Sequence, residues 1–152
     1  MEFQLLLDYL GKQLGLDTLS LNGNGVASLK FGDDLVVHLE PDPKLPAAHL
    51  YAPLCKLNAA TRNTLLEPLL IANAFGRGTA GAFFSIDEPQ QEVLLGRIFD
   101  LNQTEPEALY RHLKDLVSVL VIWRRRLPDL LAKQDAPTEF PLTEPPAGFI
   151  RA

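Results

Sequence analysis

The chain has 152 residues, close to the length of one domain, and 47% of them are hydrophobic, which fits a packed globule and argues against disorder. The formal net charge of −5 argues against a nucleic-acid-binding protein, because phosphate binding requires a basic surface. The single cysteine, Cys55, excludes an intramolecular disulfide and suits a reducing cytoplasm.

The first half of the chain predicts one helix and three strands. Residues 2–14 carry apolar side chains on one helical face, with Gly15 as the stop and Leu5 off the stripe and exposed. After a turn at 22–25, residues 27–31 and 35–40 alternate in polarity and predict a hairpin. A loop at 41–46 precedes a third strand over 49–54, in which Pro53 is expected to mark an edge or an end.

The second half predicts helix, hairpin, helix. We expect a helix over residues 59–75, irregular before its regular part because of Pro68, and strands within 80–99 that meet at a turn over 87–90. Thr104 and Glu107 match a capping box and Pro106 suits a first turn, so a third helix is expected from there to Leu127. Its apolar seam, spaced four and three residues apart, is Leu109, Leu113, Leu116, Leu120, Trp123 and Leu127.

These elements predict an α+β fold in which a mainly antiparallel, five-stranded twisted sheet is packed by three helices in the order α-β-β-β-α-β-β-α. We expect one domain over residues 1–127 and a flexible tail over 128–152, which contains five prolines.

No residue cluster predicts chemistry. Cys55 and His49 lie on one strand or its exit, and the three histidines lack metal-ligand spacing, so we expect no catalytic residue, metal or cofactor. The glycines at 76, 78 and 81 follow a helix and open a strand, the reverse of a phosphate loop, and are better explained by a helix stop and close backbone approach. The acidic pairs at 33–34 and 87–88 fit solvated turns.

Several local motifs, taken in order, resemble the class I type III secretion chaperones, the Tir-chaperone family. They are Leu5-Leu6-Leu7, residues 29–34 leading into 35–40, residues 50–54, Ala72-Asn73-Ala74-Phe75-Gly76 and Thr79-Ala80-Gly81-Ala82. The resemblance covers residues 1–127. Pro68 departs from it by interrupting the helix that commonly helps to form the family's dimer, and the tail has no clear counterpart.

The resemblance implies a bacterial cytoplasmic homodimer that is not an enzyme. It would bind the N-terminal segment of a secreted virulence effector in extended form and help to deliver it to the secretion apparatus, without nucleic acid or membrane insertion. The expected client-binding residues are Leu5, Leu6, Tyr9, Val26, Ser28, Val36 and His38. The expected dimer residues are Leu66, Leu69, Leu70, Asn73 and Phe83.

Two alternatives remain open from the sequence. The same scaffold could sequester a transcriptional regulator or another secretion chaperone, since both activities use apolar grooves. A small enzyme or ligand-sensing domain would instead require a deep pocket with convergent polar groups.

Overall fold

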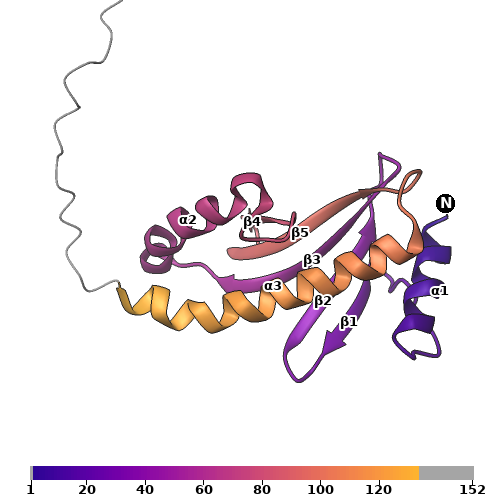
Figure 1. Cartoon of the computed structure of the whole chain (residues 1–152), viewed down its shortest axis with the longest axis horizontal. Helices are drawn as coiled ribbons and strands as arrows, with labels where there is room; N and C mark the ends of the chain where they lie inside the picture. The colour runs from indigo at the N-terminus through magenta and orange to yellow at the C-terminus, as the bar shows by residue number, and fades with distance from the viewer. Residues whose placement is uncertain (1, 134–152) are drawn as a thin grey trace, which may run out of the picture.

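A five-stranded antiparallel sheet organises the computed structural model, which describes residues 2–133 (Figure 1). The strands lie in the order β1-β2-β3-β5-β4, with bounds β1 (Ala27–Phe31), β2 (Leu35–Pro41), β3 (Ala47–Lys56), β4 (Phe83–Asp87) and β5 (Glu92–Asp100). The helices are α1 (Phe3–Gln13), α2 (Ala59–Asn73), the 3-10 turn η1 (Ala74–Gly76) and α3 (Pro106–Ala132). The predicted α+β class and element order are confirmed.

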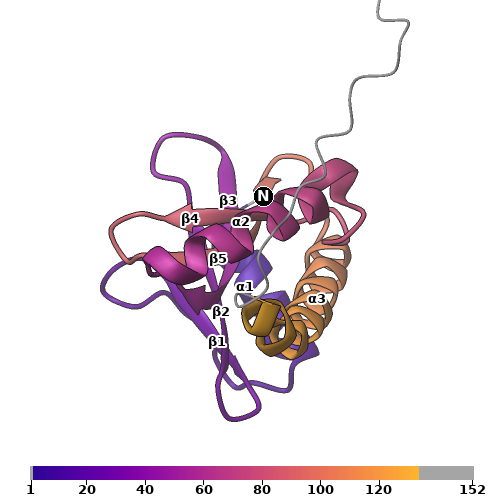
Figure 2. The ribbon, with the colours of Figure 1, turned by 90° about the vertical axis from the view of Figure 1, so that its left-hand side faces the viewer.

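One hydrophobic core joins all three helices to one face of the sheet. Alternate side chains of β1, β2 and β3 enter this core, and the intervening ones stay half-buried or exposed. The long helix α3 runs past the sheet, and α2 lies beside β4 (Figures 1 and 2). All the predicted seam residues of α3 except Leu127 are buried. We call the sheet face away from this core the outer face.

The N-terminal predictions hold closely. Helix α1 buries Leu6, Leu7 and Leu10, while Leu5 is 55% exposed, as its place off the apolar stripe predicts. Gly15 follows the helix with a positive φ of 68°, which glycine adopts without strain.

Helix α2 differs from the prediction at both ends. It is helical from Ala59, because Asn58 accepts a hydrogen bond from the Thr61 amide and the Thr61 hydroxyl accepts one from the Asn58 amide, a capping box that fixes the first turn. The irregular part is the end, where Phe75 has a φ of 56°. The helix is regular from its first turn and includes Pro68 in its interior, so the expected irregular start was wrong.

Pro53 does not end β3, which continues to Lys56. Pairing with β2 runs only from Ala48 to Tyr51, so Pro53 lies where β3 has β5 as its one paired neighbour in the described chain. The β3–β5 register also shifts between Pro53 and Cys55. A residue without an amide hydrogen is tolerated there because one side of the strand has no ladder to complete.

Helix α3 begins and ends later than predicted. Pro106 occupies the first turn, as predicted, and holds the preceding Glu105 in extended backbone. Glu105 is therefore the N-cap, and Thr104 lies one position too early for the predicted capping box. Thr104 instead donates its hydroxyl hydrogen to the carbonyl of Asp100. The helix continues through Pro128 to Ala132, so the predicted end at Leu127 was wrong. The predicted tail beyond residue 133 lies outside the described residues.

Candidate functional site

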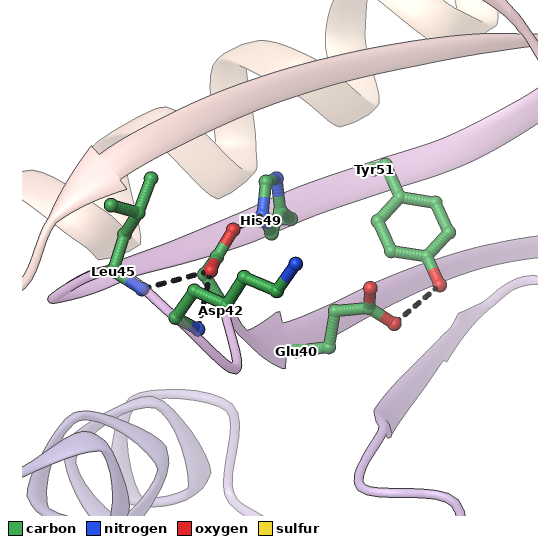
Figure 3. Close-up of polar contacts among 6 residues, drawn as sticks. Glu40, Asp42, Leu45, His49 and Tyr51 are labelled. Carbon is green, nitrogen blue, oxygen red and sulfur yellow. Dashed lines mark hydrogen bonds and ion pairs between the residues drawn. The ribbon is translucent and has the colours of Figure 1, made fainter.

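A shallow hollow of about 280 Å³ on the outer face gathers polar groups of β2, β3, β4 and β5. It exists because Gly96 presents no side chain between Tyr51 and Phe83. Within and beside it, the Tyr51 hydroxyl donates to Glu40 at 3.1 Å, and His49 Nε2 lies 3.1 Å from an Asp42 oxygen (Figure 3). The other Asp42 oxygen accepts the amides of Lys44 and Leu45.

The electrostatics of this hollow do not favour catalysis. Burial, followed by the charge of Glu40, raises the pKa of Tyr51 to about 12, so its phenol stays protonated. The Lys44 amide and the His49 side chain lower the pKa of Asp42, which therefore stays ionised. The Asp42 contacts fix the loop between β2 and β3, and the Tyr51–Glu40 hydrogen bond joins the two strands, so these groups serve the structure of the hairpin.

The other residues considered as candidates for chemistry, Cys55 and the histidines, likewise show no reactive arrangement in the described part of the chain. Burial raises the pKa of Cys55, so its thiol is not activated as a nucleophile. Residues 2–133 contain no group of three or more His, Cys, Asp or Glu placed to hold a metal ion. His38 does not meet His49 but contacts Ser28, with 2.9 Å between its Nδ1 and the hydroxyl oxygen, and packs on Tyr51.

The glycine-rich loop connects η1 to β4 and packs between α2 and α3. A side chain at Gly78 would come within 2.8 Å of the Ala72 Cβ, so glycine is needed for this close approach, as predicted. The indole of Trp123 donates to the Gly78 carbonyl at 3.1 Å, and its ring meets Phe84 edge-on. The contacts of this loop therefore pack α2, α3 and β4 together and do not form an anion-binding site.

The same segment closes the outer edge of β4. The Asn73 side chain donates to the Phe84 carbonyl at 3.0 Å and accepts from the Phe84 amide at 2.7 Å. Just before β4, the hydroxyl of the buried Thr79 donates to the Ala82 carbonyl, and the Thr79 carbonyl accepts from the Ala82 amide, which closes a local turn. The Asn73 contacts take the place of a neighbouring strand at Phe84, so an added strand is blocked at this part of β4.

The opposite edge of the sheet is open. Strand β1 pairs with β2, and no other described strand pairs with it. An extended peptide can add to such an edge through backbone hydrogen bonds, and its alternate side chains then point to the two faces of the sheet.

The predicted client-binding residues are divided between the outer face of the sheet, helix α1 and the segment before β1. Ser28, Val36 and His38 lie on the outer face, opposite the core-facing residues of β1 and β2. Leu5 and Tyr9 belong to α1, which packs against the core, and Val26 lies half-buried just before β1. Leu6 is only 1% exposed and serves the core, so we leave it out of the surface.

Four of the five predicted dimer residues line a groove of about 370 Å³ between α2 and β4, which we call the α2/β4 groove. It is lined by Leu66, Leu69, Leu70 and Asn73 from α2 and by Phe84, Ser85 and Ile86 from β4. Leu70 is 67% exposed, whereas Leu69 is 4% exposed and packs within its own protomer. Phe83 faces the outer hollow, so the structure separates it from the other four.

Sequence reasoning missed the bonding role of Asn73, the buried Thr79 and the groove residues of β4. The polar side chains between small residues at 72–82 were the available signal, but their partners are backbone groups whose positions a sequence does not give.

A family model for the Tir chaperone protein (CesT) family matches residues 5–124. No curated protein matches the chain closely enough to serve as a relative. Among the described residues, no helix is long and apolar enough to cross a membrane.

Solved structures share the fold. The structure of the ExsC–ExsE complex matches with a TM-score of 0.67 at 24% identity, over 84% of this chain and 97% of the other. The HopA1–SchA chaperone–effector complex gives 0.66 at 18% identity, over 81% and 93%. The Yersinia pestis type III secretion chaperone SycH, in complex with a stable fragment of YscM2, gives 0.63 at 23% identity, over 80% and 99%.

Proposed function

Because this chain belongs to the Tir chaperone protein (CesT) family, we propose that it is a cytoplasmic chaperone of type III secretion. It binds the N-terminal segment of a secreted effector in extended form and keeps that effector competent for export. Holding a segment in this way needs no catalytic residue and no nucleotide.

The contrast between the two edges of the sheet carries the proposal. At the β4 edge, Asn73 occupies the amide and the carbonyl of Phe84, while the β1 edge has no described partner. A client strand added to β1 would direct some side chains toward α1 and the others toward the outer face. A client strand in that position would contact Leu5 on one side and Ser28 and Val36 on the other. A partner that lies on only one face of the sheet would not reach all three residues.

We further propose that the α2/β4 groove is the dimer interface. Leu70 and Leu66 are the apolar contacts available there, and an exposed leucine next to a hollow is a common feature of protein interfaces. Helix α2 continues through Pro68 from Ala59 to Asn73, which supports its use as a dimer element.

The proposal is tested by purifying the tagged protein from its own secretion-competent cells and identifying what co-purifies by mass spectrometry. We expect an exported protein that is lost from the complex when its N-terminal segment is deleted. Recovery of a cytoplasmic regulator alone would replace the chaperone function with a sequestering one. Recovery of no protein partner would refute both.

A further inference from the structure

A second groove lies on the side of α2 away from β4, between α2, η1 and the C-terminal half of α3. We call it the α2/α3 groove. Its volume is about 880 Å³, larger than the α2/β4 groove. The apolar part of its lining is Pro68, Ile71, Phe75, Trp123 and Leu130. The client and dimer surfaces proposed above leave it without a role.

Phe75 is the most unusual residue of this groove. Its side chain is 92% exposed and its backbone φ is 56°. A bulky residue in this left-handed region costs about 1–3 kcal/mol. Ile71, one helical turn earlier, is 65% exposed. The exposed ring and the exposed isoleucine form apolar surface that a bound segment would remove from water.

The rim of the groove is basic. The Arg77 guanidinium lies 5.4 Å from the Phe75 ring centroid, and that of Arg126 lies 4.5 Å from the Trp123 ring centroid. Glu67 is the one acidic residue of the lining. The groove therefore suits an apolar segment that carries carboxylates.

The C-terminal segment of this same chain has that composition. Residues 134–152 contain three acidic residues and one basic residue, together with four prolines and the apolar side chains of Phe140, Leu142, Phe149 and Ile150. Glu139 directly precedes Phe140. Proline-rich segments bind aromatic grooves at a reduced entropy cost, because their conformations are restricted before binding.

The segment also starts in the right place. The described chain ends at Lys133, three residues after Leu130, which itself lines the groove. Ten residues separate Leu130 from Phe140, a reach of up to about 33–36 Å, whereas Trp123 lies only about 10 Å back along the helix.

We propose that residues 137–142 bind the α2/α3 groove of their own chain. Phe140 covers Ile71 and Phe75, and Glu139 faces Arg77 and Arg126. The C-terminal segment then shields apolar surface beside α2 and leaves the α2/β4 groove and the β1 edge free.

Disulfide trapping in the full chain tests this placement. In a Cys55→Ala background, Thr138→Cys is combined with Ile71→Cys or, as the matched control, with Leu70→Cys. The two helix positions are adjacent and are 65% and 67% exposed, but they face different grooves. Under glutathione oxidation, with the joined cysteines identified by peptide mapping, we expect an intramolecular bond to form about tenfold faster at position 71 than at 70. Equal rates, or a bond that joins two chains, would overturn the proposal.

A second measurement follows hydrogen exchange along the groove. Phe140→Asp in the full chain should make the backbone amides of residues 71–78 exchange hydrogen faster, by about twofold or more. Ala147→Asp adds the same charge to the segment outside residues 137–142 and should leave this exchange unchanged. Equal effects of the two substitutions would count against a specific contact of Phe140.

Discussion

Asn73 shows how one side chain decides which edge of a sheet stays available. Its amide group bonds both the N–H and the C=O of Phe84, as a neighbouring strand would. The sequence sets this asparagine apart from Asn63 on the same helix by the small residues beside it, but it does not show what either side chain meets in space. The sequence predicted the close approach at Gly78, where local sterics suffice, but not this long-range bond.

Asn73→Ala should lower the free energy of unfolding by about 1–3 kcal/mol, because it leaves two partly buried backbone groups of β4 without their partner. Chemical denaturation followed by circular dichroism measures the change. Asn63→Ala is the control, because it makes the same chemical change at an exposed position of α2 and should stay within about 0.5 kcal/mol. Similar losses in the two variants would mean that the Asn73 contacts do not stabilise β4.

His112 should make the stability depend on pH. Burial, followed by the charges of Arg97 and Arg111, lowers its pKa below the ordinary 6.5, and Asp115 opposes the shift. The folded protein therefore disfavours the protonated imidazole, and the unfolded chain takes up more protons as the pH falls below 6.5. The contribution of His112 to stability is full above that pH and is lost as the pH falls through the lowered folded pKa.

His112→Gln keeps an acceptor for Arg97 but removes the titration. The free energy of unfolding, measured between about pH 7.5 and pH 5, should fall less steeply in the variant than in the wild type. His38, whose pKa burial also lowers, leaves a residual slope in both proteins. Parallel curves would show that His112 does not titrate differently in the two states.

At the scale of elements, the sequence predicted best where periodicity and local turns decide the structure. The α3 seam at four- and three-residue spacing and the hairpin of β1 and β2 follow directly from the pattern of apolar residues. Prolines were the main source of error for the helices, since α2 continues past Pro68 and α3 continues past Pro128. Pro53 lies within β3 at a position where only β5 pairs with it, as its expected place at an edge allows.

The open β1 edge and its flanks lead to a prediction about client binding. Leu5→Asp should weaken binding of the client's N-terminal segment roughly 5- to 30-fold, which corresponds to about 1–2 kcal/mol of lost apolar contact. The fold should be unaffected, because Leu5 is 55% exposed. Isothermal titration of the purified protein with the segment found by co-purification measures the effect.

Leu45→Asp is the matched control, since Leu45 is 62% exposed in the loop between β2 and β3 and lies outside the proposed client surface. It should leave the affinity unchanged. An equal loss in both variants would indicate a general effect of added charge, and no loss in Leu5→Asp would remove α1 from the client surface.

At the scale of the whole molecule, the proposed dimer places Leu70 of α2 in an interface between two copies of the chain. A dimer interface of standard size covers about 800 Å² on each partner, so it must extend beyond the α2/β4 groove onto the neighbouring surfaces of α2 and β4.

Burying an unpaired carboxylate in this interface costs several kcal/mol, which exceeds what the remaining contacts can offset. Leu70→Asp should therefore convert the dimer to monomers of 16.8 kDa, measured by light scattering after size-exclusion chromatography. Because Leu70 is 67% exposed in the protomer, the variant should keep the wild-type circular dichroism spectrum.

Ile122→Asp is the matched control, because it introduces the same charge at a residue of α3 that is 54% exposed, and it should remain dimeric. A dimeric Leu70→Asp would move the interface elsewhere, whereas a monomeric wild type would remove the dimer from the proposal and leave the β1 edge of a single chain to hold the client.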